Sequence, residues 1–257
     1  MSKNFELMQS VGTSFELPTF EDPRIEGSLS RKGSGERTGS FFNIKDKLIR
    51  QETLKLAQSI FLQGNVESPR VVTFAGVDAG NGCSWLCAHI ADILASQGLG
   101  RVCVVDANLR KPAMTNLFGT SNHHGLSDAL SQDGPVRDFA KPVMGENLWL
   151  LSSGSLAADQ VESASLLNSE TMKVRISELR NEFDYVLIDS APLSAHVDGV
   201  MLGQLADGLV LVLEANATRR EAAVRVADTL RASNVRIVGA VLNKRTFPIP
   251  ESVYGLL

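Results

Sequence analysis

Long apolar runs, cysteine and net positive charge are all scarce in this sequence, and each scarcity argues against a class of protein. No apolar run approaches the roughly 18 residues that a membrane-spanning helix needs, and the start, MSKNFELMQS, lacks the apolar centre of a secretory signal. The three cysteines, Cys83, Cys87 and Cys103, favour reduced thiols in a cytoplasmic protein over a disulfide framework. The net charge of −4 supplies no basic field for general binding to nucleic acid.

The chain divides by composition into a tail and one large domain. Residues 1–42 mix charges of both signs with Gly, Ser and Pro and show no sustained apolar period, which predicts a disordered tail or tether. Residues 43–257 form the predicted domain, which begins with a short amphipathic helix in KDKLIRQETLKLAQSIFLQ. With 257 residues and 44% hydrophobic residues, the chain is long enough for one α/β domain beside that tail.

Strand and helix patterns alternate from Val71 onward. Apolar runs predict strands over 71–75, 101–105, 148–152, 185–188, 208–213 and 236–242. Helices are predicted over 83–97, 165–182, 197–206 and 217–233. Strands that are apolar on both faces and separated by helices indicate a mostly parallel, doubly wound sheet in three layers, as in P-loop nucleotide-binding proteins.

Three predicted strands end in residues that could bind a ligand. In such folds ligands bind at the carboxyl ends of the strands. The first ends in the glycine-rich stretch GVDAGNGCS, residues 76–84. The other two end in acidic residues, Asp106 in VCVVDANLRKP and Asp189 in FDYVLIDSAPL. A carboxylate at a strand end beside a glycine loop is the arrangement that holds Mg²⁺ in P-loop proteins, where the hydroxyl of a loop residue such as Ser84 supplies another ligand.

The glycine-rich stretch lacks the residue that the P-loop pattern requires. Such loops end in Gly-Lys-Ser or Gly-Lys-Thr, and this one reads Gly82-Cys83-Ser84. The backbone of residues 80–84 still predicts attraction for the phosphates of ATP or ADP with Mg²⁺, because N–H groups at a helix start attract anions. The missing ammonium predicts weakened nucleotide binding by about 2–5 kcal/mol, which is roughly one and a half to three and a half decades in affinity.

Other interpretations of these residues remain open from the sequence. The glycine-rich turn would also serve as a tight strand-to-helix connection, and Asp106 and Asp189 would also cap the turns that follow them. Cys83 at a helix start is either a redox-active thiol with a lowered pKa or a small filler.

The order of the motifs GVDAGNGCS, VVDANLRKP, GLSDAL, VLIDSAP, DGLVLVLEA and GAVLNKR resembles that of the bacterial tyrosine kinases of capsule and exopolysaccharide export. These kinases belong to the deviant-Walker class of P-loop proteins, with the chromosome-partitioning and division-site ATPases. The resemblance covers roughly residues 45–257. It implies that Asp106 is the Walker A′ carboxylate, that Asp189 is the Walker B carboxylate, and that Arg110 and Asp198 follow them at the family spacing.

The sequence also departs from this family in several positions. Lysine is replaced by Cys83, the second Walker A′ aspartate by Asn108, and the extra loop lysine of the partitioning branch by Asp78. Glu52, Lys55 and Gln58 only echo the oligomerisation motif of the family, so the implied homo-oligomer rests on weak matches. The family phosphorylates a cluster of C-terminal tyrosines, whereas this chain has only Tyr185 in a predicted strand and Tyr254 as a candidate phosphoacceptor.

Three functional hypotheses follow from this resemblance. The first is a cytoplasmic, kinase-like regulatory partner of an inner-membrane chain-length or co-polymerase-type protein, peripheral at the membrane through that partner, with weak or lost autokinase activity. The second is an active MgATP-dependent autokinase that uses Asp106, Asp189, Arg110 and Tyr254. The third is a partitioning-type ATPase, although the loop lysines of that class are absent.

Overall fold

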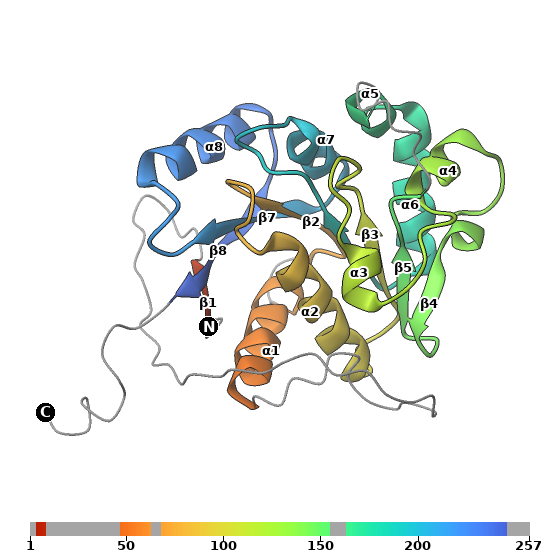
Figure 1. Ribbon diagram of the computed structural model, residues 1–257, viewed down its shortest axis with the longest axis horizontal. Coiled ribbons are helices and arrows are strands. Elements are labelled where there is room, and N and C mark those ends of the chain that lie inside the picture. The colour runs from red at the N-terminus through yellow and green to blue at the C-terminus, as the bar shows by residue number, and fades with distance from the viewer. Residues whose placement is uncertain (1–3, 9–46, 63–67, 155–162, 246–257) are drawn as a thin grey trace, which may run out of the picture.

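A single eight-stranded sheet organises the computed structural model, which describes residues 4–8, 47–62, 68–154 and 163–245 (Figure 1). The strand order is β1-β8-β7-β2-β6-β3-β5-β4. All strand pairs are parallel except β1–β8 and β4–β5, so the antiparallel strands are the two at the edges. The predicted mostly parallel α/β sheet is therefore confirmed.

The strands and helices follow one another in the alternation that the apolar pattern predicts. The strands are β1 (Asn4–Met8), β2 (Val71–Gly76), β3 (Val102–Asp106), β4 (Lys141–Met144), β5 (Leu148–Leu151), β6 (Tyr185–Asp189), β7 (Gly208–Glu214) and β8 (Ile237–Arg245). The helices are α1 (Lys47–Phe61), α2 (Cys83–Ser96), α3 (Met114–Phe118), α4 (Leu126–Ser131), the 3₁₀ turn η1 (Val136–Phe139), α5 (Ser163–Leu167), α6 (Glu170–Glu182), α7 (Asp198–Leu205) and α8 (Arg220–Ala232).

Helices cover both faces of the sheet and give the fold three layers. On one face α1, α2 and α3 bury a core that includes Phe61, Phe74 and Leu86 (Figure 1). On the other face α4 and α6 pack over β3, β5 and β6, and α7 and α8 pack over β2 and β7. The central strands β2 and β3 are fully buried, which explains their uninterrupted apolar sequences.

Several elements differ from the sequence predictions, and the short helices α3 and α4 and the turn η1 lie where no element was predicted. The predicted helix over 165–182 is two helices, because the Ser169 hydroxyl accepts a hydrogen bond from Met172 N at 3.1 Å and starts α6. Strand β4, which contains Pro142, carries no strong apolar pattern and was not predicted. Within the predicted tail, residues 4–8 form β1, and the rest of the segment up to residue 42 lies outside the described residues.

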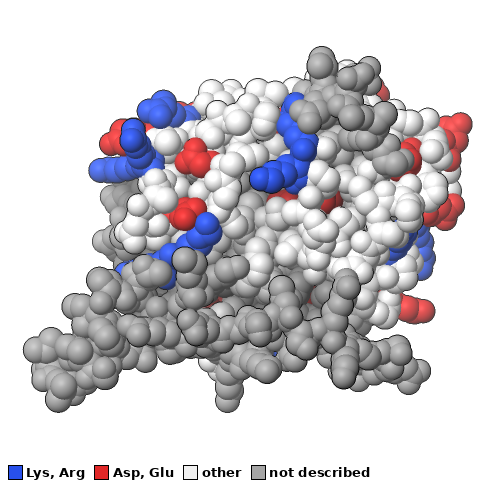
Figure 2. Space-filling view, in the orientation of Figure 1, with Lys and Arg blue, Asp and Glu red and all other residues white. Residues whose placement is uncertain are grey.

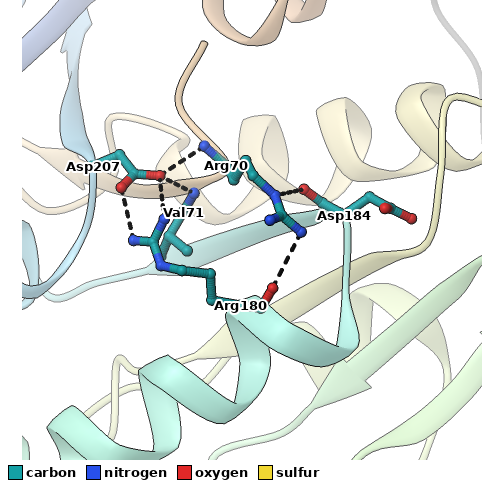
Figure 3. Close-up of polar contacts among 5 residues, drawn as sticks. All are labelled: Arg70, Val71, Arg180, Asp184 and Asp207. Atoms are coloured by element: carbon teal, nitrogen blue, oxygen red, sulfur yellow. Dashed lines mark hydrogen bonds and ion pairs between the residues drawn. The ribbon is translucent and has the colours of Figure 1, made fainter. Parts of the chain in front are cut away.

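The Asp207 carboxylate, just before β7, connects the amino end of β2 with the Arg180 side chain of α6 (Figure 3). Asp207 Oδ2 accepts hydrogen bonds from the backbone N–H groups of Arg70 and Val71 at 2.7 and 2.8 Å. The Arg180 guanidinium donates to both Asp207 oxygens, at 2.7 and 3.0 Å. Burial alone would raise the pKa of Asp207, but the hydrogen bonds from Arg180, Val71 and Arg70 outweigh it and lower the pKa.

Among the described helices, none is long and apolar enough to cross a membrane.

Candidate functional site

The three strand ends singled out from the sequence lie side by side, because β6 runs between β2 and β3. Asp106 and Asp189 are direct register partners at the ends of β3 and β6. Ala107 N donates to Asp189 O at 2.9 Å and Ser190 N donates to Phe74 O at 3.1 Å, so backbone bonds continue past the strand ends. The glycine-rich loop and both carboxylates therefore converge on one edge of the sheet.

The loop after β2 has the backbone of an anion-binding turn. Gly80 and Gly82 have φ values of +86° and +80°, which L side chains rarely adopt. Helix α2 begins at Cys83 with no side-chain cap, and its first hydrogen bond runs from Leu86 N to Gly82 O at 3.0 Å. Within the described residues, the N–H groups of Cys83 and Ser84 meet no acceptor, so they are available to an anion.

Both carboxylates are buried, and three of their four oxygen atoms lack a hydrogen-bond partner among the described residues. Asp106 Oδ2 accepts from Ala113 N at 3.0 Å and Met114 N at 2.9 Å, so one oxygen caps α3 as the alternative interpretation supposed. By donor–acceptor geometry, Asp106 Oδ1 and both oxygens of Asp189 accept no hydrogen bond within the described residues, although the Ser84 hydroxyl and the Cys83 thiol lie close enough to Asp189 to affect its pKa. Capping therefore accounts for only part of one carboxylate.

Burial makes these two groups unusually weak acids. It raises the pKa of Asp106 to about 6, although backbone N–H groups from Met114, Ala113 and Asn108 oppose the shift. For Asp189, burial and then the nearby charge of Asp106 raise the pKa to about 7, while the Ser84 hydroxyl and Cys83 thiol oppose it. Buried, unpaired carboxylate oxygens that repel each other favour a bound cation.

The donor set fits a hard divalent cation that is shared with another ligand. Two carboxylates and the Ser84 hydroxyl supply only oxygen atoms, as Mg²⁺ prefers. In the part of the chain that the structure describes, no group of three or more His, Cys, Asp or Glu side chains is arranged to hold a metal by itself. A cation here would complete its shell with water and with a ligand such as phosphate, which is the usual manner of Mg²⁺.

Cys83 occupies the position of the lysine that the loop pattern requires, and its thiol lies near Asp189. Burial first, and then the charge of Asp189, raise the pKa of Cys83 well above its usual value. The redox hypothesis needed a lowered pKa at this helix start, and the shift runs in the opposite direction. The side chain thus faces the site as a neutral thiol.

Arg110 reaches the same edge but is engaged elsewhere. Its Nε lies 3.3 Å from Asp198 Oδ2, and the Asp198 side chain is fully buried at the start of α7. This ion pair ties the loop after β3 to α7. In Figure 2 the Lys and Arg side chains on this face form several separate groups, including one over α8 and one near the loop after β3, and acidic side chains lie between and beside them.

One residue that the sequence hypotheses did not single out, Asn243 at the end of β8, also contacts the glycine-rich loop. Its Nδ2 donates to Asn81 O at 2.8 Å, and a Cβ on Gly82 would lie only 2.4 Å from that Nδ2. The sequence offers no local signal for this contact, since it joins residues 162 positions apart. Among the candidate tyrosines, Tyr185 packs edge-on against Phe61 at 5.4 Å, and Tyr254 lies outside the described residues.

Comparisons with known proteins agree with the fold and with the family that the motifs resemble. The family model for the cellulose biosynthesis protein BcsQ matches residues 70–235. Tyrosine-protein kinase YwqD of Bacillus subtilis is 32% identical over 176 residues, which cover 68% of this chain and 72% of YwqD. The succinoglycan biosynthesis transport protein ExoP of Rhizobium meliloti is 30% identical over 190 residues, 74% of this chain but only 24% of ExoP.

Solved structures give the same picture. The crystal structure of the VpsO kinase domain superposes with a TM-score of 0.69 at 26% identity and covers 80% of this chain and 100% of that domain. The septum site-determining protein MinD of Pyrococcus horikoshii, solved with Mg-ADP, has a TM-score of 0.56 at 18% identity, over 66% of this chain and 68% of MinD. The second likeness concerns the fold alone.

Proposed function

Because the chain belongs to the family of bacterial tyrosine kinases of capsule and exopolysaccharide biosynthesis, we propose that it is a kinase-like regulatory protein of that process with weak or lost autokinase activity. The observation that carries this proposal is the neutral Cys83 thiol beside Asp189, in a loop that keeps its unpaired N–H groups. The site retains the parts that hold an anion and a cation. Its loop lacks the lysine of the P-loop pattern, and the nearby Lys244 side chain, whose Cε would lie 3.9 Å from a Cβ on Gly82, is paired with Glu214 at 3.0 Å.

A nucleoside diphosphate or triphosphate with Mg²⁺ is the ligand that fits the described residues. The backbone of residues 80–84 would contact the phosphates, and Ser84, Asp106 and Asp189 would hold the cation. When bound, Mg²⁺ neutralises charge on the phosphate oxygens. Asp106 and Asp189 then stand as ionised carboxylates, because a cation offsets the burial that raises their pKa values.

The missing lysine sets the expected strength of binding. Removal of one partner from a desolvated charge pair costs about 2–5 kcal/mol, or roughly one and a half to three and a half decades in affinity. Arg110 is paired with Asp198 at 3.3 Å and so does not simply replace the lost charge. We therefore expect weak nucleotide binding and slow or absent phosphoryl transfer.

Calorimetric titration with Mg-ADP tests this proposal on three full-length proteins. Wild type should bind weakly, and Cys83→Lys should bind at least tenfold more tightly because it restores an ammonium group beside Asp189. Cys83→Met is the matched control, since it lengthens the side chain without adding charge and should not gain affinity. Wild-type binding as tight as that of Cys83→Lys would show that another group supplies the positive charge and would overturn the proposal.

The proposed partner is an inner-membrane chain-length or co-polymerase-type protein, which would place this chain in the cytoplasm at the membrane surface. The name of ExoP, a succinoglycan biosynthesis transport protein, supports a link to polysaccharide export. Deletion of the gene should change the amount or chain length of the surface polysaccharide. Unchanged polysaccharide on both measures would contradict this part of the proposal.

An active autokinase is the second candidate, and the orphaned carboxylate oxygens favour it because they suit Mg²⁺–nucleotide. Tyr254 would be the acceptor, since Tyr185 lies within β6 and packs on Phe61. Incubation with labelled ATP distinguishes the two candidates. Phosphotyrosine that disappears in both Asp106→Asn and Tyr254→Phe would replace the regulatory proposal with this one.

A further inference from the structure

The end of β8 contains a bulge that faces the N-terminal strand. Asn4 pairs with Arg245 and Glu6 pairs with Leu242. One residue of β1 therefore lies between the two pairs, whereas two residues of β8 lie between them. The extra residue in β8 falls at Asn243–Lys244, and Lys244 has φ +59°. Two residues of one strand opposite one residue of its partner define a β-bulge, and bulges redirect the neighbouring side chain.

The bulge directs Asn243 into the glycine-rich loop. Its side chain is 1% exposed, its Oδ1 accepts from Lys244 N at 2.8 Å, and its Nδ2 donates to Asn81 O at 2.8 Å. Asn81 in turn accepts from Asp78 N at 2.7 Å through its own side chain. Two hydrogen bonds that share Asn81, one to its backbone oxygen and one to its side chain, therefore connect the bulged residue of β8 with the start of the loop.

We propose that the N-terminal strand controls the anion-binding loop: pairing of residues 4–8 with β8 fixes the bulge, and the bulge positions Asn243 to hold Asn81 and Gly82. Asn243 is thus a positioning residue that transmits the state of the tail to the site. The control of ligand affinity rests on the proposed nucleotide site. The control of loop mobility does not depend on any ligand.

The lengths of the segments make β1 suited to this role. It is five residues long, and residues 9–46 join it to α1, so its pairing must offset the closure of a long connection. Such a strand detaches more readily than the buried central strands. When it leaves, Leu242 to Arg245 lose the antiparallel partner that defines the bulge.

Proline substitutions in the full-length chain test the coupling without removal of the tail. Glu6→Pro and Leu7→Pro each remove one backbone N–H, and consecutive residues of a strand point their N–H groups in opposite directions. One variant therefore breaks a bond to β8, and the other is its matched control. Hydrogen exchange of the ligand-free proteins identifies which variant releases the amides of β8.

The variant that releases β8 should also speed exchange in the peptide that contains residues 78–86 by at least threefold, and the control should not. Asn243→Ala should speed the same peptide, and the double variant should add little, since both changes break one pathway. Asn243→Asp keeps the acceptor for Lys244 N but loses the donor to Asn81 O, so it should match Asn243→Ala in the loop peptide. Released β8 amides with an unchanged loop peptide would overturn the proposal.

Titration with Mg-ADP extends the test to the site. The β8-releasing variant should bind Mg-ADP at least threefold more weakly than the control proline variant. If wild type binds no Mg-ADP, the proposed nucleotide site fails, while the exchange measurement still decides whether strand and loop are coupled. Equal Mg-ADP affinity in the two proline variants, where wild type does bind, would overturn the control of affinity.

Discussion

Asp106 and Asp189 are register partners on neighbouring strands, and each has a buried carboxylate oxygen with no hydrogen-bond partner in the part of the chain that the structure describes. Two acidic groups in this position oppose folding unless a proton or a cation joins them. The two carboxylates therefore lower the free energy of unfolding of the ligand-free protein, and this loss can be measured by substitution.

Asp189→Asn should stabilise the protein at pH 8 and leave it almost unchanged at pH 4. Burial raises the pKa of Asp189 from 3.8 to about 7, so the folded state holds its proton more tightly than the unfolded chain. The stabilisation contributed by the protonated Asp189 is fully present below pH 3.8 and is lost as the pH rises towards 7. The loss is at most about 4 kcal/mol. Urea unfolding at several pH values measures the difference.

An exposed aspartate provides the control for this pH dependence. Asp133→Asn also replaces an aspartate with its amide, and it should change the free energy of unfolding little because Asp133 is exposed. Equal stability of wild type and Asp189→Asn at pH 8 would contradict the raised pKa of Asp189, to which burial contributes most and the charge of Asp106 next.

Gly82→Ala should destabilise the protein more than Gly80→Ala. Both glycines have φ near +80°, so both substitutions add backbone strain of about 1–3 kcal/mol. Only at Gly82 would the new Cβ also collide with Asn243 Nδ2, at 2.4 Å, whereas nothing lies within 4 Å of a Cβ on Gly80. Thermal unfolding of the pair separates the contact from the strain, and equal losses would argue against the close approach of Asn243.

Asp207→Ala should reduce the free energy of unfolding by about 1–3 kcal/mol, because it leaves the backbone N–H groups of Arg70 and the partly buried Val71, and the Arg180 guanidinium, without their acceptor. Since the pKa of Asp207 is lowered, this contribution is present at neutral pH and is lost as the pH falls below 3.8. Asp228→Ala removes an exposed pair with Arg231 and should change little. Equal effects of the two variants would disprove the structural role of Asp207.

The residue Cys83 is partly exposed, but its thiol is desolvated and lies near Asp189, and both effects raise its pKa. Cys83 should therefore react slowly with iodoacetamide at pH 8. Asp189→Asn removes the nearby charge and should increase the rate of alkylation several-fold. Cys103, with a pKa raised to about 12, should remain unmodified in both proteins. Peptide mass spectrometry gives the rate at each cysteine, and rapid wild-type alkylation at Cys83 would revive the redox hypothesis.

The apolar pattern predicts the central sheet well, because β2, β3, β6 and β7 are buried on both faces and their sequences are continuously apolar. The convergence of the glycine-rich loop with Asp106 and Asp189 also follows from the parallel order of the strands. Edge strands β1 and β4 are only five and four residues long, and their sequences carry no such pattern.

The contact between Asn243 and the loop depends on a bulge and on a pairing between distant residues, which no local pattern encodes. The raised pKa values of Asp106 and Asp189 likewise come from the depth at which the folded sheet places them. Sequence patterns thus give the positions of these residues along the chain. Their electrostatic state depends on the assembled layers.

Pro142 lies in β4, at the edge of the sheet opposite β1. A proline has no N–H group to offer, so a foreign strand that approached this edge would meet an incomplete ladder of donors. Strand-by-strand aggregation is therefore disfavoured at the β4 edge. Resistance to self-association during storage should then depend on whether β1 stays paired with β8 at the other edge.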